Sequence, residues 1–145
     1  MKYIFYLPVF CIAVMAFACR TTGKSTDTTT SQTIHQNWML KTIDSVDDAL
    51  VLKSKAFINL SDTTAAIAKA GCNNLRFGVK LSENNGITFT QGIATKMYCA
   101  EFMPAENGLT AALKKIKSYT VAAHKIWFKD ADGKTLIIGV AENGD

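Results

Sequence analysis

The residues of this chain that could carry the widest range of chemistry are its four cysteines and two histidines. Cys72 and Cys99 could form a disulfide, bind a metal or supply a nucleophilic thiolate, and each role requires different neighbours. A structural zinc site needs four ligands, and a reactive thiolate needs a basic partner that lowers its pKa. No Cys-x-x-Cys occurs, and neither His35 nor His124 forms a ligand pair with a neighbour. The spacing therefore predicts no metal, no cofactor and no catalytic residue.

Another cysteine, Cys19, ends an apolar run that has the features of an export signal. One lysine precedes the apolar stretch from Tyr3 to Phe17, and the small residue Ala18 comes just before the cysteine. The run is too short for a helix that spans a bilayer, which needs about 20 apolar residues. We predict that residues 1–18 are a signal peptide that is removed on export.

A cysteine at the first mature position resembles the lipobox of bacterial lipoproteins. That resemblance implies that the Cys19 thiol is acylated, with palmitate among the chains, and that the protein is firmly attached because two or more chains anchor stably. Ala16 stands where Leu is commonest and Phe17 is bulky, so simple secretion and a retained anchor stay open as alternatives. Arg20 replaces the Asp that keeps some lipoproteins at the inner membrane. We therefore expect a lipid-anchored protein of the bacterial cell envelope, at the outer membrane and facing the periplasm or the surface.

The residues from 19 to 37 are expected to form the lipidated cysteine and a flexible tether. The segment is dense in Thr, Ser and Gln, and Ile34 is its one sizeable apolar side chain. Burial of such a composition cannot offset the entropy lost on ordering. The remaining residues, 38–145, are enough for one domain with a single core.

Outside the cytoplasm, Cys72 and Cys99 are expected to form a disulfide, and two buried free thiols are the alternative. In the chain-entropy model, closing a loop of this length stabilises the fold by roughly 3–4 kcal/mol. A domain of this size gains from such a covalent link because its core is small.

Other motifs that could carry catalysis or binding are missing or incomplete. The chain has no Gly-x-Ser-x-Gly and no His-Glu-x-x-His, and the Gly-Lys-Ser run at 23–25 lacks the first Gly of a phosphate-binding loop. Three aspartates between positions 44 and 48 lie on an expected turn, where solvated acids are ordinary. The formal charge of +4 is evenly spread along the chain. The basic run at 114–117 is typical of the solvent-exposed face of a helix. We expect no binding to nucleic acid.

Alternating apolar and polar residues predict several short antiparallel strands. The first starts at Trp38, whose side chain is expected in the core, and the clearest alternation, from 75 to 81, predicts one strand. Further strands are expected at 56–60, in the region 87–99, near 119–121, and in a terminal hairpin of 125–129 with 134–140. The large side chains expected to fill the interior are Phe77, Phe89, Trp127 and Phe128.

One helix is expected to begin at Pro104, since proline is tolerated in a first turn. Its apolar stripe follows the i, i+3, i+4, i+7 spacing and consists of Leu109, Ala112, Leu113 and Ile116. The segment from Ala65 to Ala70 is ambiguous, because its alanines and the following Gly71 favour a helix by propensity. These elements predict an α+β fold, with a small antiparallel sheet or partly open barrel and one packed helix.

A set of motif residues recurs in order along the domain: Trp38, Gly71-Cys72-Asn73, Phe77-Gly78, Thr95-x-Met97-x-Cys99, Glu106, Leu109, Leu113 and Tyr119. This pattern resembles the META domain family of bacterial envelope proteins, also called HslJ-like, and the resemblance covers nearly all of Trp38 to Val140. It implies a strand over Ala65–Ala70 in place of the helix, because strand context can override propensity. It also implies that the motif residues are architectural.

The resemblance and the missing catalytic motifs predict a non-enzymatic, membrane-anchored protein that binds an envelope protein or a small apolar ligand. A role under stress is implied, because family members are linked with heat-shock induction and antibiotic tolerance. Two other functions stay open: a barrel whose interior is a lipid-binding cavity, and a hydrolase. An apolar cavity above about 300 Å³ would favour ligand binding.

Overall fold

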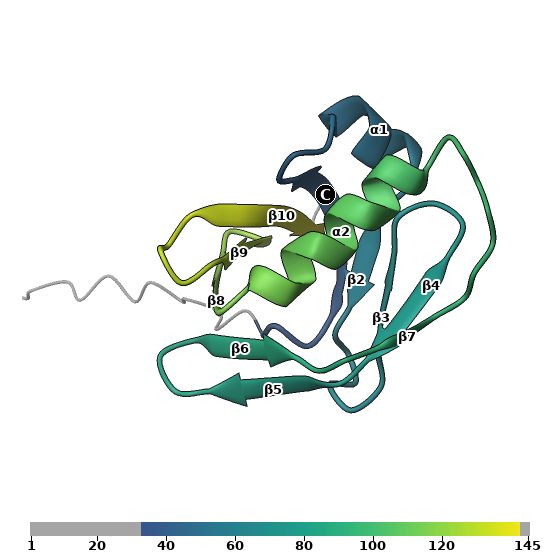
Figure 1. Ribbon diagram of the computed structural model, residues 1–145. Helices are drawn as coiled ribbons and strands as arrows, with labels where there is room; N and C mark the ends of the chain where they lie inside the picture. Colours follow the sequence, from purple (N-terminus) through teal and green to yellow (C-terminus); the bar gives the residue numbers. More distant parts are fainter. Residues whose placement is uncertain (1–32, 143–145) are drawn as a thin grey trace, which may run out of the picture.

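The computed structural model describes residues 33–142, which form a ten-stranded antiparallel sheet curled into a half-open barrel (Figure 1). Its strands are β1 (Asn37–Ile43), β2 (Phe57–Asn59), β3 (Ala66–Lys69), β4 (Asn74–Phe77), β5 (Val79–Ser82), β6 (Gly86–Phe89), β7 (Ile93–Ala94), β8 (Ser118–Ala122), β9 (Lys125–Lys129) and β10 (Thr135–Ala141). Their order in the sheet is β5-β6-β8-β9-β10-β1-β2-β3-β4-β7. The fold is therefore mostly β, with the partly open barrel that the sequence predicted.

The longer helix, α2 (Met103–Lys115), lies across the sheet (Figure 1). Its buried side chains include the predicted Leu109, Ala112 and Leu113, and Ile116 is buried just after its end. Pro104 stands in its first turn, as expected. Within residues 33–142, no helix is long and apolar enough to cross a bilayer.

A short helix, α1 (Asp48–Lys53), corrects the expectation of a single helix. The predicted turn at 44–48 leads directly into it. The carboxylate of Asp47 accepts a hydrogen bond from the backbone N–H of Leu50 at 3.1 Å and so caps the helix. Val51 is fully buried and fixes the helix against the rest of the fold. The expected turn was right, but the helix that it caps was missed.

The core is centred on the neighbouring strands β1, β9 and β10. Trp38 and Phe128 are fully buried, and the indole N–H of Trp38 donates a hydrogen bond to the carbonyl of Ile34 at 2.9 Å. Ile34 is itself buried, so the packed region includes a residue that composition assigned to the tether. Trp127 was expected in the interior but is only half-buried, because it faces away from its buried neighbours Ile126 and Phe128 on the same strand.

The run from 75 to 81 is two strands, which corrects the prediction of one. Its break is at Gly78, whose backbone N–H donates to the hydroxyl of Thr90 at 2.9 Å and whose carbonyl accepts from the N–H of Thr90 at 2.8 Å. Before the break β4 pairs with β3 and β7, and after it β5 pairs with β6. The chain bends here because its two halves belong to opposite ends of the sheet. Leu81, on the strand after the bend, is exposed.

The ambiguous segment at 65–70 contains strand β3, as the family resemblance implied. Ala66, Ala68 and Ala70 are buried, and Ile67 and Lys69 between them are half-buried. Hydrogen bonding to β2 on one side and β4 on the other satisfies the backbone. These tertiary partners outweigh the helical propensity of the alanines.

Candidate functional site

The turn Gly71-Cys72-Asn73 is held by one carboxylate, that of Glu106 on α2. Oε1 of Glu106 accepts the backbone N–H of Cys72 at 2.8 Å and that of Asn73 at 2.9 Å. Oε2 accepts the side-chain amide of Asn73 at 2.6 Å. Both oxygens are therefore engaged in fixing the turn to the helix.

The side chain of Asn73 extends the same network to the segment after β7. Its amide N–H donates to the carbonyl of Met97 at 2.9 Å, and its Oδ1 accepts from the hydroxyl of Thr95 at 2.9 Å and the N–H of Met97 at 2.8 Å. The structure also contains the expected disulfide between Cys72 and Cys99. Residues from the two sequence motifs thus meet in one network.

Gly71 is required in this turn for two reasons. Its φ is +118°, a conformation that residues with a side chain rarely adopt. A Cβ at this position would also lie 2.3 Å from Cβ of Phe102, the residue that precedes α2. The helix can therefore approach the turn only because position 71 has no side chain. The other motif positions Trp38 and Leu113 lie in the core, and Gly78 is at the bend between β4 and β5.

Two adjoining concavities run beside this network, between α2 and the strands β4 and β7. Their volumes are about 320 Å³ and 570 Å³, and they share Leu75, Ala94 and Thr110. We call them together the α2 groove. The helix lines the groove with one face, through Met103, Glu106, Asn107, Thr110, Leu113 and Lys114. At 1.5 Å per residue, this face is about 16 Å long.

The larger concavity has an aromatic floor. Phe77 and Phe89 line it. Their rings meet edge to face, with centroids 5.3 Å apart. Phe89 also packs against the fully buried Phe128, at a centroid distance of 5.9 Å. The floor is therefore the outer surface of the core, and Phe89 is only half-buried there. Leu113 of α2 forms part of the opposite wall.

The smaller concavity is bordered by exposed apolar side chains and by lysines. Met97 and Tyr98 line it, with 55% and 84% of their surfaces exposed. Lys69 and Lys96 line the same concavity, and Lys114 lines the larger one. Such a run of exposed apolar residues beside a groove is typical of a binding surface.

The clustered acids between positions 44 and 48 have structural partners instead of a shared site. Asp44 accepts a hydrogen bond from Nζ of Lys134 at 2.7 Å, and this bond lowers the pKa of Asp44 below its ordinary value. Asp47 caps α1, and Asp48 lies in its first turn. Within residues 33–142, no three His, Cys, Asp or Glu side chains come close enough to hold a metal ion.

The Asp-x-Asp-Gly sequence before β10 forms a hairpin turn. Oδ1 of Asp130 accepts the backbone N–H groups of Asp132 and Lys134 at 3.0 and 2.9 Å. The predicted lipidation site, Cys19, and the Gly-Lys-Ser run at 23–25 lie outside the described residues.

Sequence reasoning did not predict the α2 groove. Its walls come from a helix face, from β4 and from β7, which are far apart in the chain. One local signal was available: Ile93, Met97 and Tyr98 are apolar but follow no strand or helix period. An irregular apolar segment of this kind can indicate a surface that is exposed for binding.

The model of the META domain family matches residues 30–143 of this chain. An NMR structure of a protein from Burkholderia xenovorans superposes with a TM-score of 0.55 and 17% identity, covering 75% of this chain and 83% of that one. A second NMR structure has a TM-score of 0.53 and 21% identity, covering 73% and 89%. At these identities, the likeness to the two structures concerns the fold alone. A comparison with curated proteins found no match.

Proposed function

The chain belongs to the META domain family, and on that basis we propose that it is a non-enzymatic, lipid-anchored envelope protein that binds a small apolar ligand in the α2 groove. The observation that carries this proposal is the larger concavity, about 570 Å³ in volume and floored by Phe77 and Phe89. Ligand sites in proteins usually measure about 300–1,000 Å³ and are lined mainly by apolar side chains.

The ligand is held beside the barrel and not inside it. The interior is occupied by Trp38, Ile58 and Phe128, which are fully buried. The groove, by contrast, is open along one face of α2. This differs from a lipid-binding barrel of the closed type, in which the cavity lies at the centre of the strands.

Anchoring by Cys19 would keep the groove close to a membrane. The residues from Arg20 to Thr33 would span at most about 50 Å if fully extended, at up to 3.6 Å per residue. Apolar molecules are scarce in the aqueous envelope and abundant at membranes. A groove tethered within this distance could take up such a ligand during envelope stress.

The polar contacts support a binding role over hydrolysis. Glu106 is the acid that lines the groove, and both of its oxygens accept hydrogen bonds from the motif turn. A general base must be free to accept a proton from the substrate or water. The exposed Met97 and Tyr98 favour a second candidate, in which an envelope protein docks at the rim of the groove.

A substitution that fills the groove tests the proposal. Thr110 lines both concavities, so Thr110→Phe places a ring at their junction. Ala111→Phe is the matched control, since Ala111 is exposed on the same helix and lines neither. The assay is fluorescence titration of the neutral probe N-phenyl-1-naphthylamine. It uses the mature chain from residue 19 with Cys19→Ser, so that no attached lipid competes.

We expect saturable binding to the starting protein and a loss of at least about tenfold in affinity for Thr110→Phe, equivalent to about 1.4 kcal/mol. The control should bind within about twofold of the starting protein, since 0.4 kcal/mol corresponds to that factor. Absence of saturable binding, or equal binding by Thr110→Phe, would contradict the proposed function.

A further inference from the structure

A row of side chains crosses five neighbouring strands, from β9 through β10, β1 and β2 to β3. Lys125 is paired with Val140, and Val140 with Met39. Met39 is paired in turn with Phe57, and Phe57 with Lys69. At roughly 4.8 Å between strands, the row is about 19 Å long. It has three apolar residues in its middle and a lysine at each end.

The row lies on the outer face of the sheet, because the residues that flank it along the strands point inward. Ile126, Leu40 and Ile58 are such neighbours and are buried, and successive side chains of a strand point to opposite faces. Trp127, which is paired with Ile138, adds a second apolar pair to the outer face. The two apolar sets and the two terminal lysines form what we call the outer patch: Met39, Phe57, Lys69, Lys125, Trp127, Ile138 and Val140.

The outer patch is more apolar than a solvated sheet face requires. An antiparallel sheet with one face in water normally alternates apolar residues inward with polar residues outward. Here the five apolar residues of the patch are only half-buried, although they point outward. A contiguous group of partly exposed apolar side chains is typical of a surface that meets a protein or a membrane.

The charges around the outer patch have one sign. The charged residues within the strands are all basic, and they are Lys41, Lys69, Arg76, Lys80, Lys125 and Lys129. Two acids, Asp130 and Glu142, directly follow β9 and β10, and Glu142 accepts a hydrogen bond from the side-chain amide of Asn37 at 2.8 Å. Among residues 33–142, the ion pairs involve Lys53 and Lys134, so the two lysines of the patch have no acidic partner. The patch therefore presents a net positive charge.

We propose that the outer patch docks on the surface of an anionic phospholipid bilayer. The apolar residues enter the boundary between head groups and acyl chains, and the lysine amines reach the lipid phosphates while their stems lie along apolar surface. Trp127 suits this boundary, because an indole has an apolar body and a polar N–H. Each lysine near an anionic surface contributes to binding, and the effect decreases within a Debye length.

The shape of the outer face favours a bilayer over a protein partner. The sheet curls into a half-open barrel with α2 across its inner side, so the outer face is convex (Figure 1). A fluid lipid surface adapts to a convex face, whereas a protein partner needs a matching hollow. Docking of the outer patch leaves the α2 groove uncovered and does not depend on the ligand of the groove.

Vesicle flotation tests the partner. The mature chain from residue 19 carries Cys19→Ser, so that any binding comes from the folded domain. We expect it to bind vesicles of phosphatidylglycerol and phosphatidylcholine at least about tenfold more tightly than vesicles of phosphatidylcholine alone, equivalent to about 1.4 kcal/mol. Added salt should weaken this binding, because it screens exposed charges. Equal binding to both vesicles, or none to the anionic ones, would overturn the proposal.

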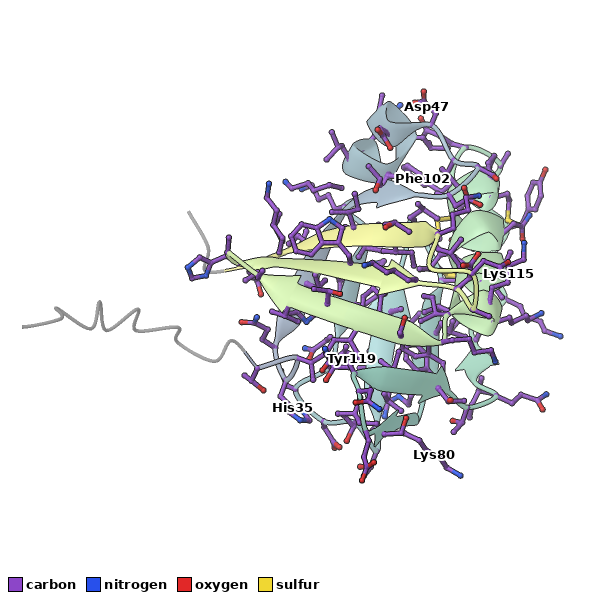
Figure 2. All side chains as sticks on the ribbon, turned by 90° about the vertical axis from the view of Figure 1, so that its left-hand side faces the viewer. His35, Asp47, Lys80, Phe102, Lys115 and Tyr119 are labelled. Carbon is purple, nitrogen blue, oxygen red and sulfur yellow. A yellow bond between two sulfur atoms is a disulfide. The ribbon has the colours of Figure 1, made fainter. Side chains whose placement is uncertain are left out.

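The double variant Lys69→Gln/Lys125→Gln tests which face docks. We expect its affinity for the anionic vesicles to fall at least about tenfold. The matched control is Lys80→Gln/Lys115→Gln, which removes the same charge outside the outer patch. Figure 2 is viewed from the side of β8, β9 and β10 and shows Lys80 toward its lower edge and Lys115 toward its right-hand side. An equal loss in both variants would reflect net charge alone and would overturn the placement on this face.

Tryptophan fluorescence gives a second readout of the docked face. The chain has two tryptophans, of which Trp127 is half-buried on the outer patch and Trp38 is fully buried in the core. We expect brominated phospholipids in the anionic vesicles to quench the emission of the bound protein, and Trp127→Phe to remove this quenching. Quenching that persists in Trp127→Phe, or bound protein that is not quenched at all, would contradict docking through the outer patch.

Discussion

The two halves of the molecule are held together by different forces. In the half formed by β1, β9 and β10, large apolar side chains pack against one another, and Trp38, Ile126, Phe128 and Ile137 are fully buried. In the half formed by β4, β7 and the start of α2, the contacts are hydrogen bonds around Asn73 and Glu106 and the Cys72–Cys99 disulfide. We call them the packed half and the motif half. Because specific polar bonds and a covalent link fix the motif half, its apolar side chains are free to face a groove.

The largest expected effect is on the packed half. Phe128→Ala should lower the free energy of unfolding by about 3–5 kcal/mol, because it removes a fully buried ring and leaves a cavity. Chemical denaturation followed by circular dichroism measures this change. If the variant does not fold, Phe128→Leu should still fold and lose less. A loss below about 0.5 kcal/mol for Phe128→Ala, the size of an ordinary surface effect, would show that the packed half is not held by burial.

A comparable loss is expected when the covalent link of the motif half is removed. Cys72→Ser/Cys99→Ser should lower the free energy of unfolding by about 3.5 kcal/mol in the chain-entropy model. The affinity for N-phenyl-1-naphthylamine should change by less than about threefold, equivalent to about 0.6 kcal/mol, because Asn73 still holds the segment at Thr95 and Met97. Complete loss of probe binding in a folded double variant would mean that the hydrogen bonds alone do not shape the groove.

The smallest expected effect depends on pH and lies at the edge of the packed half, where Asp44 follows β1 and Lys134 precedes β10. The hydrogen bond from Lys134 lowers the pKa of Asp44 in the folded state below the ordinary value of 3.8. A carboxyl group with a lowered folded pKa stabilises the fold above its unfolded pKa, and this stabilisation is lost as the pH falls through the folded value. Asp44→Asn should therefore reduce the melting temperature slightly at neutral pH, and this deficit should shrink as the pH falls below the ordinary value of 3.8. A deficit that is the same at neutral and at acidic pH would argue against the ion pair as the cause.

Local periodicity predicted most of the packed half and the helix. The apolar stripe of Leu109, Ala112 and Leu113 could be recognised from the sequence because one face of α2 is buried along its length. Periodicity failed at Gly78, since the alternation continues through the bend while the pairing partner changes from β3 to β6. The short α1 was missed although Asp47 carried a capping signal, because six residues give too little periodicity to recognise.

The disulfide of the motif half was expected from the compartment of the protein, whereas the architectural role of its other motif residues was implied only by the family resemblance. The hydrogen bonds between Asn73, Met97 and Glu106 join segments separated by 24 and 33 residues, which no local pattern encodes. The α2 groove also depends on contacts between distant segments, because residues as far apart in sequence as Leu75 and Thr110 form one surface. Sequence reasoning recognised the residues that build the groove's support, but not the groove itself.

The most direct test of the central claim is a map of the ligand on the molecule by NMR. The isotope-labelled mature chain with Cys19→Ser is titrated with N-phenyl-1-naphthylamine, and backbone amide shifts are followed. We expect saturable shifts at Leu75, Ala94 and Thr110, which line both concavities, and none at Ile126 or Ile137 of the packed half. Shifts centred on β9 and β10, or the absence of any saturable shift, would contradict the assignment of the α2 groove as a binding site.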